Sequence, residues 1–126
     1  MNVLFADDDT KMHLILTLWL KKHAHEVDCV SDGQKALQLL EKQSYDILIT
    51  DVNMPLVNGI ELIHQAMKLL SLPPLIIVLT SRCDIPELRN EIEAASVHLF
   101  NKPFSPSALM ELIDELEQKK NQEAAT

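Results

Sequence analysis

Two hydrophobic patterns alternate along this chain of 126 residues. Short apolar runs rich in β-branched residues predict five strands, at residues 3–6, 27–30, 47–50, 75–80 and 97–100. Between them lie longer stretches whose apolar residues recur at helical spacing. Five strands that alternate with five helices predict an α/β domain built on a parallel sheet, with helices covering both faces.

The helical stretches have recognisable core faces and ends. Asn58 and Asp84, each followed three residues later by Glu, and Ser105, followed by Pro, are typical of helix starts. We expect the polar chain from Gln118 onward to fray, so that residues 1–119 form the domain and 120–126 a tail or the start of a linker. Apolar stripes predict the residues that face the core: Ile15, Leu16, Trp19, Leu20, Leu37, Leu40, Ile60, Ile63, Met67, Leu70, Leu109, Leu112, Ile113 and Leu116.

Composition and charge narrow the function classes. The chain is 47% hydrophobic, which excludes disorder as a reading of the whole chain. It carries 19 Asp and Glu against 11 Lys and Arg, a net charge of −8. Such a surface repels phosphate backbones and anionic lipids, so we expect neither direct nucleic-acid binding nor membrane binding.

Other residue types give weaker signals. The start of the chain has no basic region typical of a targeting segment, and we expect a cytoplasmic protein. Cys29 and Cys83 form no metal motif and no disulfide framework. Among the histidines, only His23 and His25 have ligand-like spacing, and we expect them to complement the end of the first helix rather than bind a metal.

Acidic and hydroxyl residues follow the predicted strands where their carboxyl ends meet. Asp7, Asp8 and Asp9 follow the first strand and Asp51 the third, while Thr80 and Ser81 follow the fourth, and Lys102 and Pro103 the fifth. In a parallel sheet, this edge is where ligands bind. Carboxylates on neighbouring strands, about 5 Å apart, repel by roughly 3 kcal/mol at an effective dielectric constant of about 20. We therefore expect a hard cation there, Mg²⁺ or Mn²⁺.

That combination suits phosphoryl chemistry. A divalent ion with open coordination positions, together with the Lys102 ammonium, can hold a phosphoryl group. Asp51 would then be a carboxylate nucleophile that forms an acyl phosphate.

Five segments carry a family resemblance: residues 4–9 (LFADDD), 46–55 (DILITDVNMP), 58–59 (NG), 77–81 (IVLTS) and 101–104 (NKPF). Over residues 1–119 the chain resembles the receiver domain of a bacterial two-component response regulator, similar to the single-domain chemotaxis regulators. The resemblance implies a (βα)5 flavodoxin-like three-layer fold with a five-stranded parallel sheet in the order 2-1-3-4-5.

The resemblance also implies a role for each matching residue. Asp51 would accept a phosphoryl group from a histidine kinase or phosphotransfer protein, and Asp8 would bind Mg²⁺ directly while Asp7 acts through water. The Asn53 carbonyl would be a further metal ligand. Thr80 and Ser81 would contact the phosphoryl group, with Thr80 as the switch hydroxyl, and Lys102 would pair with the phosphoryl oxygens. The Lys102–Pro103 peptide would be cis, and Arg82 would lie beside the pocket.

Two features depart from the family pattern. Leu99 stands where relatives carry Tyr or Phe. We therefore hypothesise a switch that relies on Thr80 and the loop after strand four, with Leu99 as a small apolar plug. Phe100, next to it, is expected to pack in the core. Leu14 and Leu18, one helical turn apart, are either scattered surface leucines or a contact patch for a homodimer or a kinase domain.

The leading hypothesis is a phosphorylation-controlled switch that acts by binding a partner, with no external substrate. One alternative is a receiver-like interaction module that works without phosphorylation. Another is a Mg²⁺-dependent aspartyl-phosphate phosphohydrolase, which would want an acid at Asn53. The downstream target is either another protein or an output domain outside this sequence.

Overall fold

The computed structural model describes residues 1–54, 56–81 and 97–125. Within these ranges the chain forms five strands and four helices. The helix predicted to begin near Asp84 lies outside the described residues. In chain order the elements are β1 (Asn2–Ala6), α1 (Thr10–Lys22), β2 (Glu26–Val30), α2 (Gly33–Lys42), β3 (Ile47–Asp51), α3 (Gly59–Leu69), β4 (Leu75–Thr80), β5 (Val97–Asn101) and α5 (Pro106–Ala125).

All five strands join one parallel sheet in the order β2-β1-β3-β4-β5. The predicted strand positions, fold class and strand order are confirmed. The register sets Ala6 beside Thr50, and Thr80 beside Asn101. It therefore brings the chain segments that follow β1, β3, β4 and β5 to one edge of the sheet, at the carboxyl ends of the strands.

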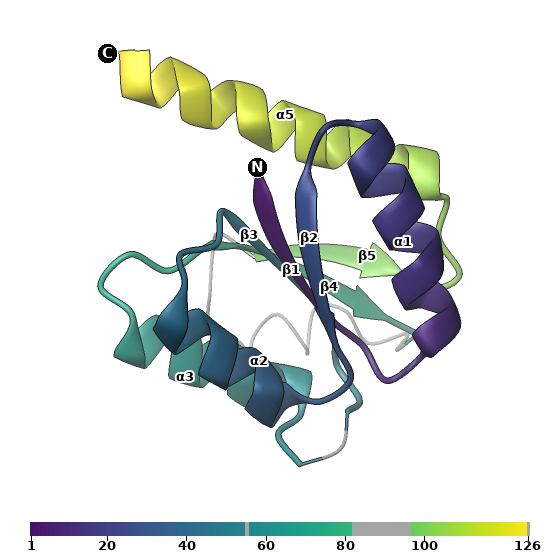
Figure 1. The fold of residues 1–126 in the computed structure, drawn as a ribbon, viewed down its shortest axis with the longest axis vertical. Helices are drawn as coiled ribbons and strands as arrows, with labels where there is room; N and C mark the ends of the chain where they lie inside the picture. Colours follow the sequence, from purple (N-terminus) through teal and green to yellow (C-terminus); the bar gives the residue numbers. More distant parts are fainter. Residues whose placement is uncertain (55, 82–96, 126) are drawn as a thin grey trace.

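The sheet is the middle of three layers, with α1 and α5 on one face and α2 and α3 on the other (Figure 1). β3 is buried along its whole length, as a central strand covered on both faces should be. Alternate residues of each strand point to opposite faces, which divides the core in two. Phe5, Ile49 and Leu79 pack toward α1 and α5, whereas Leu4 and Leu48 pack toward α2 and α3.

The predicted caps on α3 and α5 are present. The Asn58 side chain accepts a hydrogen bond from the Glu61 backbone nitrogen at 2.9 Å, and α3 follows directly. Ser105 precedes Pro106, the first residue of α5, and its hydroxyl oxygen lies 3.4 Å from the Ala108 nitrogen. These local signals fix where the two helices begin.

Two expectations about the helices were wrong. On α1, Ile15 is 38% exposed, and Met12 instead packs against the core with Leu16, Trp19 and Leu20. Met12 lies one turn before Leu16 and therefore shares its face, whereas Ile15 is rotated away from it. In addition, the chain does not fray at Gln118, because α5 continues to Ala125. An ion pair between Lys120 and Asp46, the residue before β3, anchors this extension.

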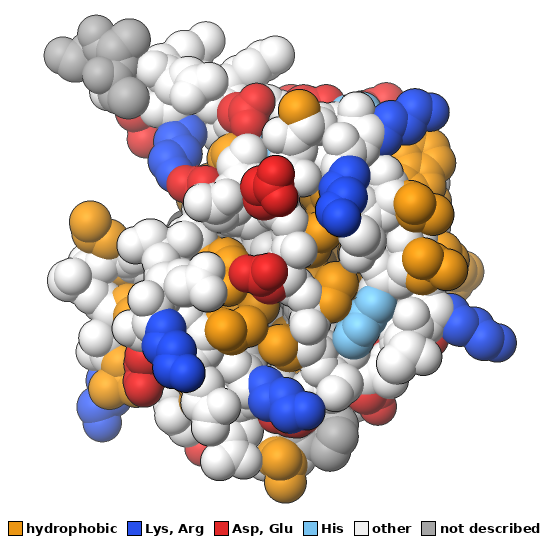
Figure 2. All heavy atoms as spheres, viewed as in Figure 1, with side chains coloured by type: hydrophobic (Ala, Val, Ile, Leu, Met, Phe, Trp, Pro, Cys, Tyr) orange, Lys and Arg blue, Asp and Glu red, His pale blue; other side chains and the backbone are white. Residues whose placement is uncertain are grey.

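The outer face of α1 carries an apolar patch made of Leu14, Ile15 and Leu18, with Leu14 64% and Leu18 62% exposed. Figure 2 shows hydrophobic side chains gathered over α1 on the right of the molecule. The predicted exposure of the two leucines is confirmed.

None of the described helices is long and apolar enough to cross a membrane.

Candidate functional site

Three carboxylates meet at the carboxyl end of the sheet. Asp7 and Asp8 follow β1 and Asp51 ends β3, and each offers an oxygen within 4.8 Å of the other two. Asp7 is fully buried and Asp51 is 8% exposed, whereas Asp8 is exposed. The sheet register therefore brings together the acidic residues that were predicted to meet at this edge.

Lys102 supplies the positive charge of the cluster. Its Nζ donates a hydrogen bond to Asp7 Oδ2 at 3.0 Å and lies 3.5 Å from Asp51 Oδ2. The Lys102 backbone nitrogen donates to the Thr80 carbonyl oxygen at 2.7 Å, which continues the pairing of β5 with β4 past the end of the strand. The ammonium thus contacts two of the three carboxylates, and one positive charge against three negative ones leaves the site with an excess of negative charge.

Burial and charge shift two pKa values at this site. Burial raises the pKa of Asp51, and Asp7 raises it further, although Lys102 and the Val52 nitrogen act in the opposite direction. Burial alone would lower the pKa of Lys102, but its contacts with Asp7 and Asp51 outweigh that effect and raise it. An ionised Asp51 is therefore costly in the absence of a further cation, while Lys102 stays charged.

Backbone groups orient the two buried carboxylates. Asp7 Oδ1 accepts a hydrogen bond from the Asp9 nitrogen at 2.9 Å, and Asp51 Oδ1 accepts one from the Val52 nitrogen at 2.8 Å. With Lys102 on its second oxygen, Asp7 has both carboxylate oxygens engaged. Among the described residues, the hydrogen bond to Asp51 is on Oδ1, and its Oδ2 lies 3.5 Å from the Lys102 ammonium, so Asp51 is the more available of the two carboxylates.

Gly59 determines how closely α3 approaches Asp51. A Cβ at Gly59 would lie 2.1 Å from the Asp51 carbonyl oxygen, so a larger residue would require the backbone to move. The Gly59 nitrogen donates to the Val52 carbonyl oxygen at 2.9 Å, which closes the β3–α3 loop. The Asn58-Gly59 pair thus fixes both the start of α3 and the position of the backbone that carries Asp51.

Asp9 is not part of the cluster. It is the N-cap of α1, and its Oδ1 accepts a hydrogen bond from the Lys11 nitrogen at 3.0 Å. The acidic group consists of Asp7 and Asp8 with Asp51. This is the assignment that followed from the register of the first strand, rather than one based on Asp8 and Asp9.

The remaining predicted residues lie around this cluster. Thr80 is buried at the end of β4 and Ser81 is exposed directly after it, while Asn53 is exposed in the β3–α3 loop. The Lys102–Pro103 peptide bond is cis. A depression of about 360 Å³ lies beside the site, and it is lined by Asp9, Met12, Ser81, Lys102, Pro103 and Phe104.

Leu99 and Phe100 pack on opposite faces of β5. Leu99 contacts the core on the α2 and α3 side, whereas Phe100 packs on the α1 and α5 side, with its ring edge-on to Phe104. The expectation that Phe100 has a packing role is confirmed. Arg82 and Cys83 lie outside the described residues, and Cys29 is a half-buried free thiol.

Sequence reasoning missed one residue next to the site. His13, on the first turns of α1, places its Nε2 2.5 Å from the Asp7 carbonyl oxygen, and its ring is edge-on to Phe5. It therefore helps to hold the segment that leads into the acidic pair. Its position one turn after the N-cap Asp9 was the available signal, but that position does not by itself show that the ring turns back toward β1.

The donor set fits a hard divalent cation. The converging ligands are all carboxylate oxygens, which Mg²⁺ and Mn²⁺ prefer. The net negative charge left after pairing with Lys102, together with the exposure of Asp8, favours a cation that keeps part of its water shell.

Solved structures of similar fold come from several bacteria. The Francisella response regulator 1452 receiver domain has a TM-score of 0.85 at 26% identity, covering 94% of this chain and 98% of that one. The chemotaxis response regulator CheY4 of Vibrio cholerae has a TM-score of 0.79 at 29% identity, covering 91% and 97% of the two chains.

Curated relatives are mostly longer proteins. The chain is 32% identical over 108 residues to the probable transcriptional regulator ycf27 of Galdieria sulphuraria, covering 86% of this chain and 42% of that protein. It is 28% identical over 110 residues to the transcriptional regulatory protein CutR of Streptomyces coelicolor, covering 87% and 50%. This chain thus spans about half the length of such regulators.

The match to a family extends over nearly the whole chain. Residues 3–114 match the family model described as the response regulator receiver domain, and this range contains Asp7, Asp8, Asp51 and Lys102. The range, the strand order and the convergence of the acidic residues at the carboxyl edge of the sheet agree with one another. The chain therefore belongs to the response regulator receiver domain family of two-component signalling.

Proposed function

We propose that this protein is a phosphoacceptor switch in which Asp51 receives a phosphoryl group from a phosphohistidine of a histidine kinase or phosphotransfer protein. The observation that carries the proposal is the position of Lys102 Nζ, 3.0 Å from Asp7 and 3.5 Å from Asp51, inside a group of three carboxylates. A structural ion pair needs one acid, whereas a phosphoryl site needs an acid to react, others to hold a cation, and a separate cation for the phosphoryl oxygens.

In the transfer, a carboxylate oxygen of Asp51 forms a bond to phosphorus as the bond from phosphorus to the donor's imidazole nitrogen breaks. The leaving imidazole keeps that electron pair and takes a proton from solvent. Lys102 Nζ lies 3.5 Å from Asp51 Oδ2, close enough for the ammonium to pair with the negatively charged phosphoryl oxygens once they are bonded to Asp51. Thr80 and Ser81, at the end of β4, supply hydroxyl groups at the same edge.

Asp8 and Asp51, with the Asn53 backbone carbonyl, would hold Mg²⁺, and Asp7 would act through water. Both Asp7 oxygens are already engaged, by Lys102 and by the Asp9 nitrogen, which supports the indirect role. When bound, Mg²⁺ neutralises charge on the acid and on the phosphoryl group.

The output follows from the change at Asp51 and consists of altered binding to a partner. Leu99 occupies the position of the usual aromatic residue, so the switch relies on Thr80 and the loop after β4, with Leu99 as an apolar plug packed toward α2 and α3. The partner is a separate protein or an output domain outside this sequence, and the setting is cytoplasmic. The protein phosphorylates and dephosphorylates itself but has no external substrate.

Incubation with acetyl phosphate tests the proposal, with intact mass as the readout. We expect one phosphoryl group per chain in Mg²⁺, and none in EDTA or in Asp51→Asn. Asp9→Asn is the matched control: it changes the neighbouring acid but keeps an N-cap residue, so phosphorylation should persist. Absence of any Mg²⁺-dependent adduct in the unchanged protein would instead support the phosphorylation-independent module.

The output hypothesis has its own measurement. NMR spectra with and without beryllofluoride, which mimics the phosphoryl group, should change around residues 84–104. Spectra that stay the same in that region would contradict the switch through Thr80 and Leu99. Steady turnover of a phosphate ester would instead favour the phosphohydrolase, although Asn53 stands where such an enzyme would want an acid.

A further inference from the structure

The chain has only two glycines, and both lie against the loop that follows β3. A Cβ at Gly59 would meet the Asp51 carbonyl oxygen. A Cβ at Gly33, the first residue of α2, would lie 2.0 Å from the Val57 carbonyl oxygen. That distance is far below any real contact between a Cβ and a backbone oxygen, so the close approach requires glycine. The two glycines therefore hold this loop near both of its ends.

The connection between β2 and α2, which contains Gly33, also contacts the segment that carries the acidic pair. The Asp7 nitrogen donates a hydrogen bond to the carbonyl oxygen of Val30, the last residue of β2, at 3.1 Å. Asp32, the buried N-cap of α2, comes directly before Gly33. This connection therefore contacts both segments from which the metal ligands are proposed to come.

The loop that Gly33 contacts is strained. Leu56 has a φ of 68° and is 76% exposed. This left-handed region is unfavourable for a residue with a large side chain, and the exposed leucine gains little packing in return. Such a conformation persists where neighbouring contacts determine it. Those contacts are made by Val57, against Gly33, and by Asn58 and Gly59, which begin α3.

We propose that Gly33 is a positioning residue for the divalent cation, because its contact with Val57 fixes the loop that carries Asn53. The inference rests on the proposed function, since it takes Asp8, Asp51 and the Asn53 carbonyl as the ligands of Mg²⁺. Gly33 acts through the Val57 backbone rather than as a ligand, and its effect on phosphorylation follows from its effect on the metal.

A side chain at position 33 would move the loop rather than the helix. α2 is held by Ala36 and Leu40, which are buried in the core, whereas the loop is exposed at Leu56. The Val57 oxygen would have to move by about 1 Å to reach the 3.0 Å below which real Cβ contacts essentially do not occur. Mg²⁺ requires nearly ideal octahedral geometry with bonds of about 2.0–2.1 Å, so a shift of this size in the loop weakens its binding.

Calorimetric titration of the full chain with Mg²⁺ tests the role of Gly33. Gly33→Ala should weaken Mg²⁺ binding by about 10- to 100-fold, the range seen when groups that orient metal ligands are replaced. Phosphorylation by acetyl phosphate should slow at low Mg²⁺ and recover when Mg²⁺ is saturating.

A second substitution separates positioning from a general loss of stability. In Gly33→Ala/Leu56→Gly the loop can adjust just before Val57, because glycine accepts positive φ without strain. Most of the Mg²⁺ affinity should therefore return. The matched control is Ala36→Gly, which weakens the same helix without a clash and should leave Mg²⁺ affinity within about twofold.

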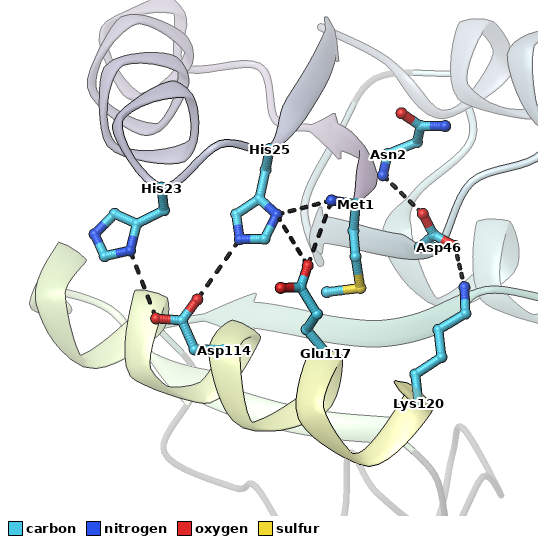
Figure 3. Close-up of polar contacts among 8 residues, drawn as sticks. All are labelled: Met1, Asn2, His23, His25, Asp46, Asp114, Glu117 and Lys120. Carbon is cyan, nitrogen blue, oxygen red and sulfur yellow. Dashed lines mark hydrogen bonds and ion pairs between the residues drawn. The ribbon is translucent and has the colours of Figure 1, made fainter. Parts of the chain in front are cut away.

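Two further controls lie at the opposite end of the sheet (Figure 3). Asp46 accepts a hydrogen bond from the Asn2 nitrogen at 2.7 Å and pairs with Lys120, and Asp114 Oδ1 lies 3.6 Å from His25 Nε2. Asp46→Ala and Asp114→Ala should lower the melting temperature but leave Mg²⁺ affinity unchanged. A loss of affinity in these variants equal to that in Gly33→Ala would overturn the proposal.

Hydrogen exchange in the unchanged protein decides the question if Gly33→Ala does not fold. Mg²⁺ should slow exchange at the amides of residues 32–36 together with 56–59, relative to residues 40–43 at the other end of α2. Exchange at 32–36 that ignores Mg²⁺ would overturn the proposal, as would a folded Gly33→Ala with unchanged affinity. In both cases the proposed function stands if the unchanged protein is phosphorylated in Mg²⁺, whereas an unchanged protein that binds no Mg²⁺ would overturn both.

Discussion

Replacing Asp51 by Asn should stabilise the protein in metal-free buffer. The Asp51 carboxylate lies 3.5 Å from the Lys102 ammonium, an attraction of about 5 kcal/mol at an effective dielectric constant of about 20. One of its oxygens lies within 4.8 Å of one oxygen from each of Asp7 and Asp8, and a repulsion at that distance is worth about 3–4 kcal/mol on the same scale before screening. Burial is the largest cost of the Asp51 charge, and with the repulsion from Asp7 it outweighs the attraction of Lys102, so the pKa of Asp51 is raised.

Solvent screens the repulsion from the exposed Asp8, so the net cost of the Asp51 charge is smaller than these pair energies suggest. We expect Asp51→Asn to raise the free energy of unfolding by about 1–2 kcal/mol. For a chain of this size, that corresponds to a rise in melting temperature of about 3–8 °C. Urea unfolding in EDTA measures the difference, and Mg²⁺ should stabilise the unchanged protein more than Asp51→Asn. Asp9→Asn, which keeps the cap of α1, should change little.

The pH dependence provides a second check. Because the pKa of Asp51 is raised in the folded state, the folded protein holds this proton more tightly than the unfolded chain does. Ionisation of Asp51 therefore lowers stability as pH rises from its ordinary value of 3.8 through the folded pKa, and the full cost is present above that pKa. The advantage of Asp51→Asn should shrink on acidification, and a variant less stable than the unchanged protein in EDTA at neutral pH would refute the reasoning.

Three further variants test other parts of the molecule. Gly59→Ala should lower the free energy of unfolding in urea by at least about 2 kcal/mol, because the alanine Cβ would lie 2.1 Å from the Asp51 carbonyl oxygen. The same displacement should slow phosphorylation by acetyl phosphate, and a variant as stable as the unchanged protein would contradict this. Leu16→Ala, at a fully buried site, should cost about 2–5 kcal/mol, and a cost below 1 kcal/mol would mean that the site collapses to fill the cavity. Leu14→Glu/Leu18→Glu should leave folding intact but disrupt any homodimer seen by sedimentation, and an unchanged monomer would remove that role for α1.

Much of the fold could be predicted because its signals are local. The apolar runs that became β1 to β5, and caps such as Asn58 and Ser105, act through neighbours a few residues away. The placement of Asp7, Asp8 and Asp51 at one edge followed once the sheet was taken to be parallel. Ile15 was misassigned because both Met12 and Ile15 are compatible with helical spacing, and only packing against the sheet chooses between them.

The amino-acid sequence by itself determined the order of elements and the strand positions, because hydrophobic period and capping are properties of short segments. With a parallel sheet assumed, it also indicated which acidic residues meet at one edge. Only the tertiary structure decided which ring or ammonium meets which carboxylate. Lys102 reaches Asp7 across 95 positions of the chain, and His25 meets Asp114 because α1 and α5 share a face. Such contacts depend on distances across the fold, and no local pattern encodes them.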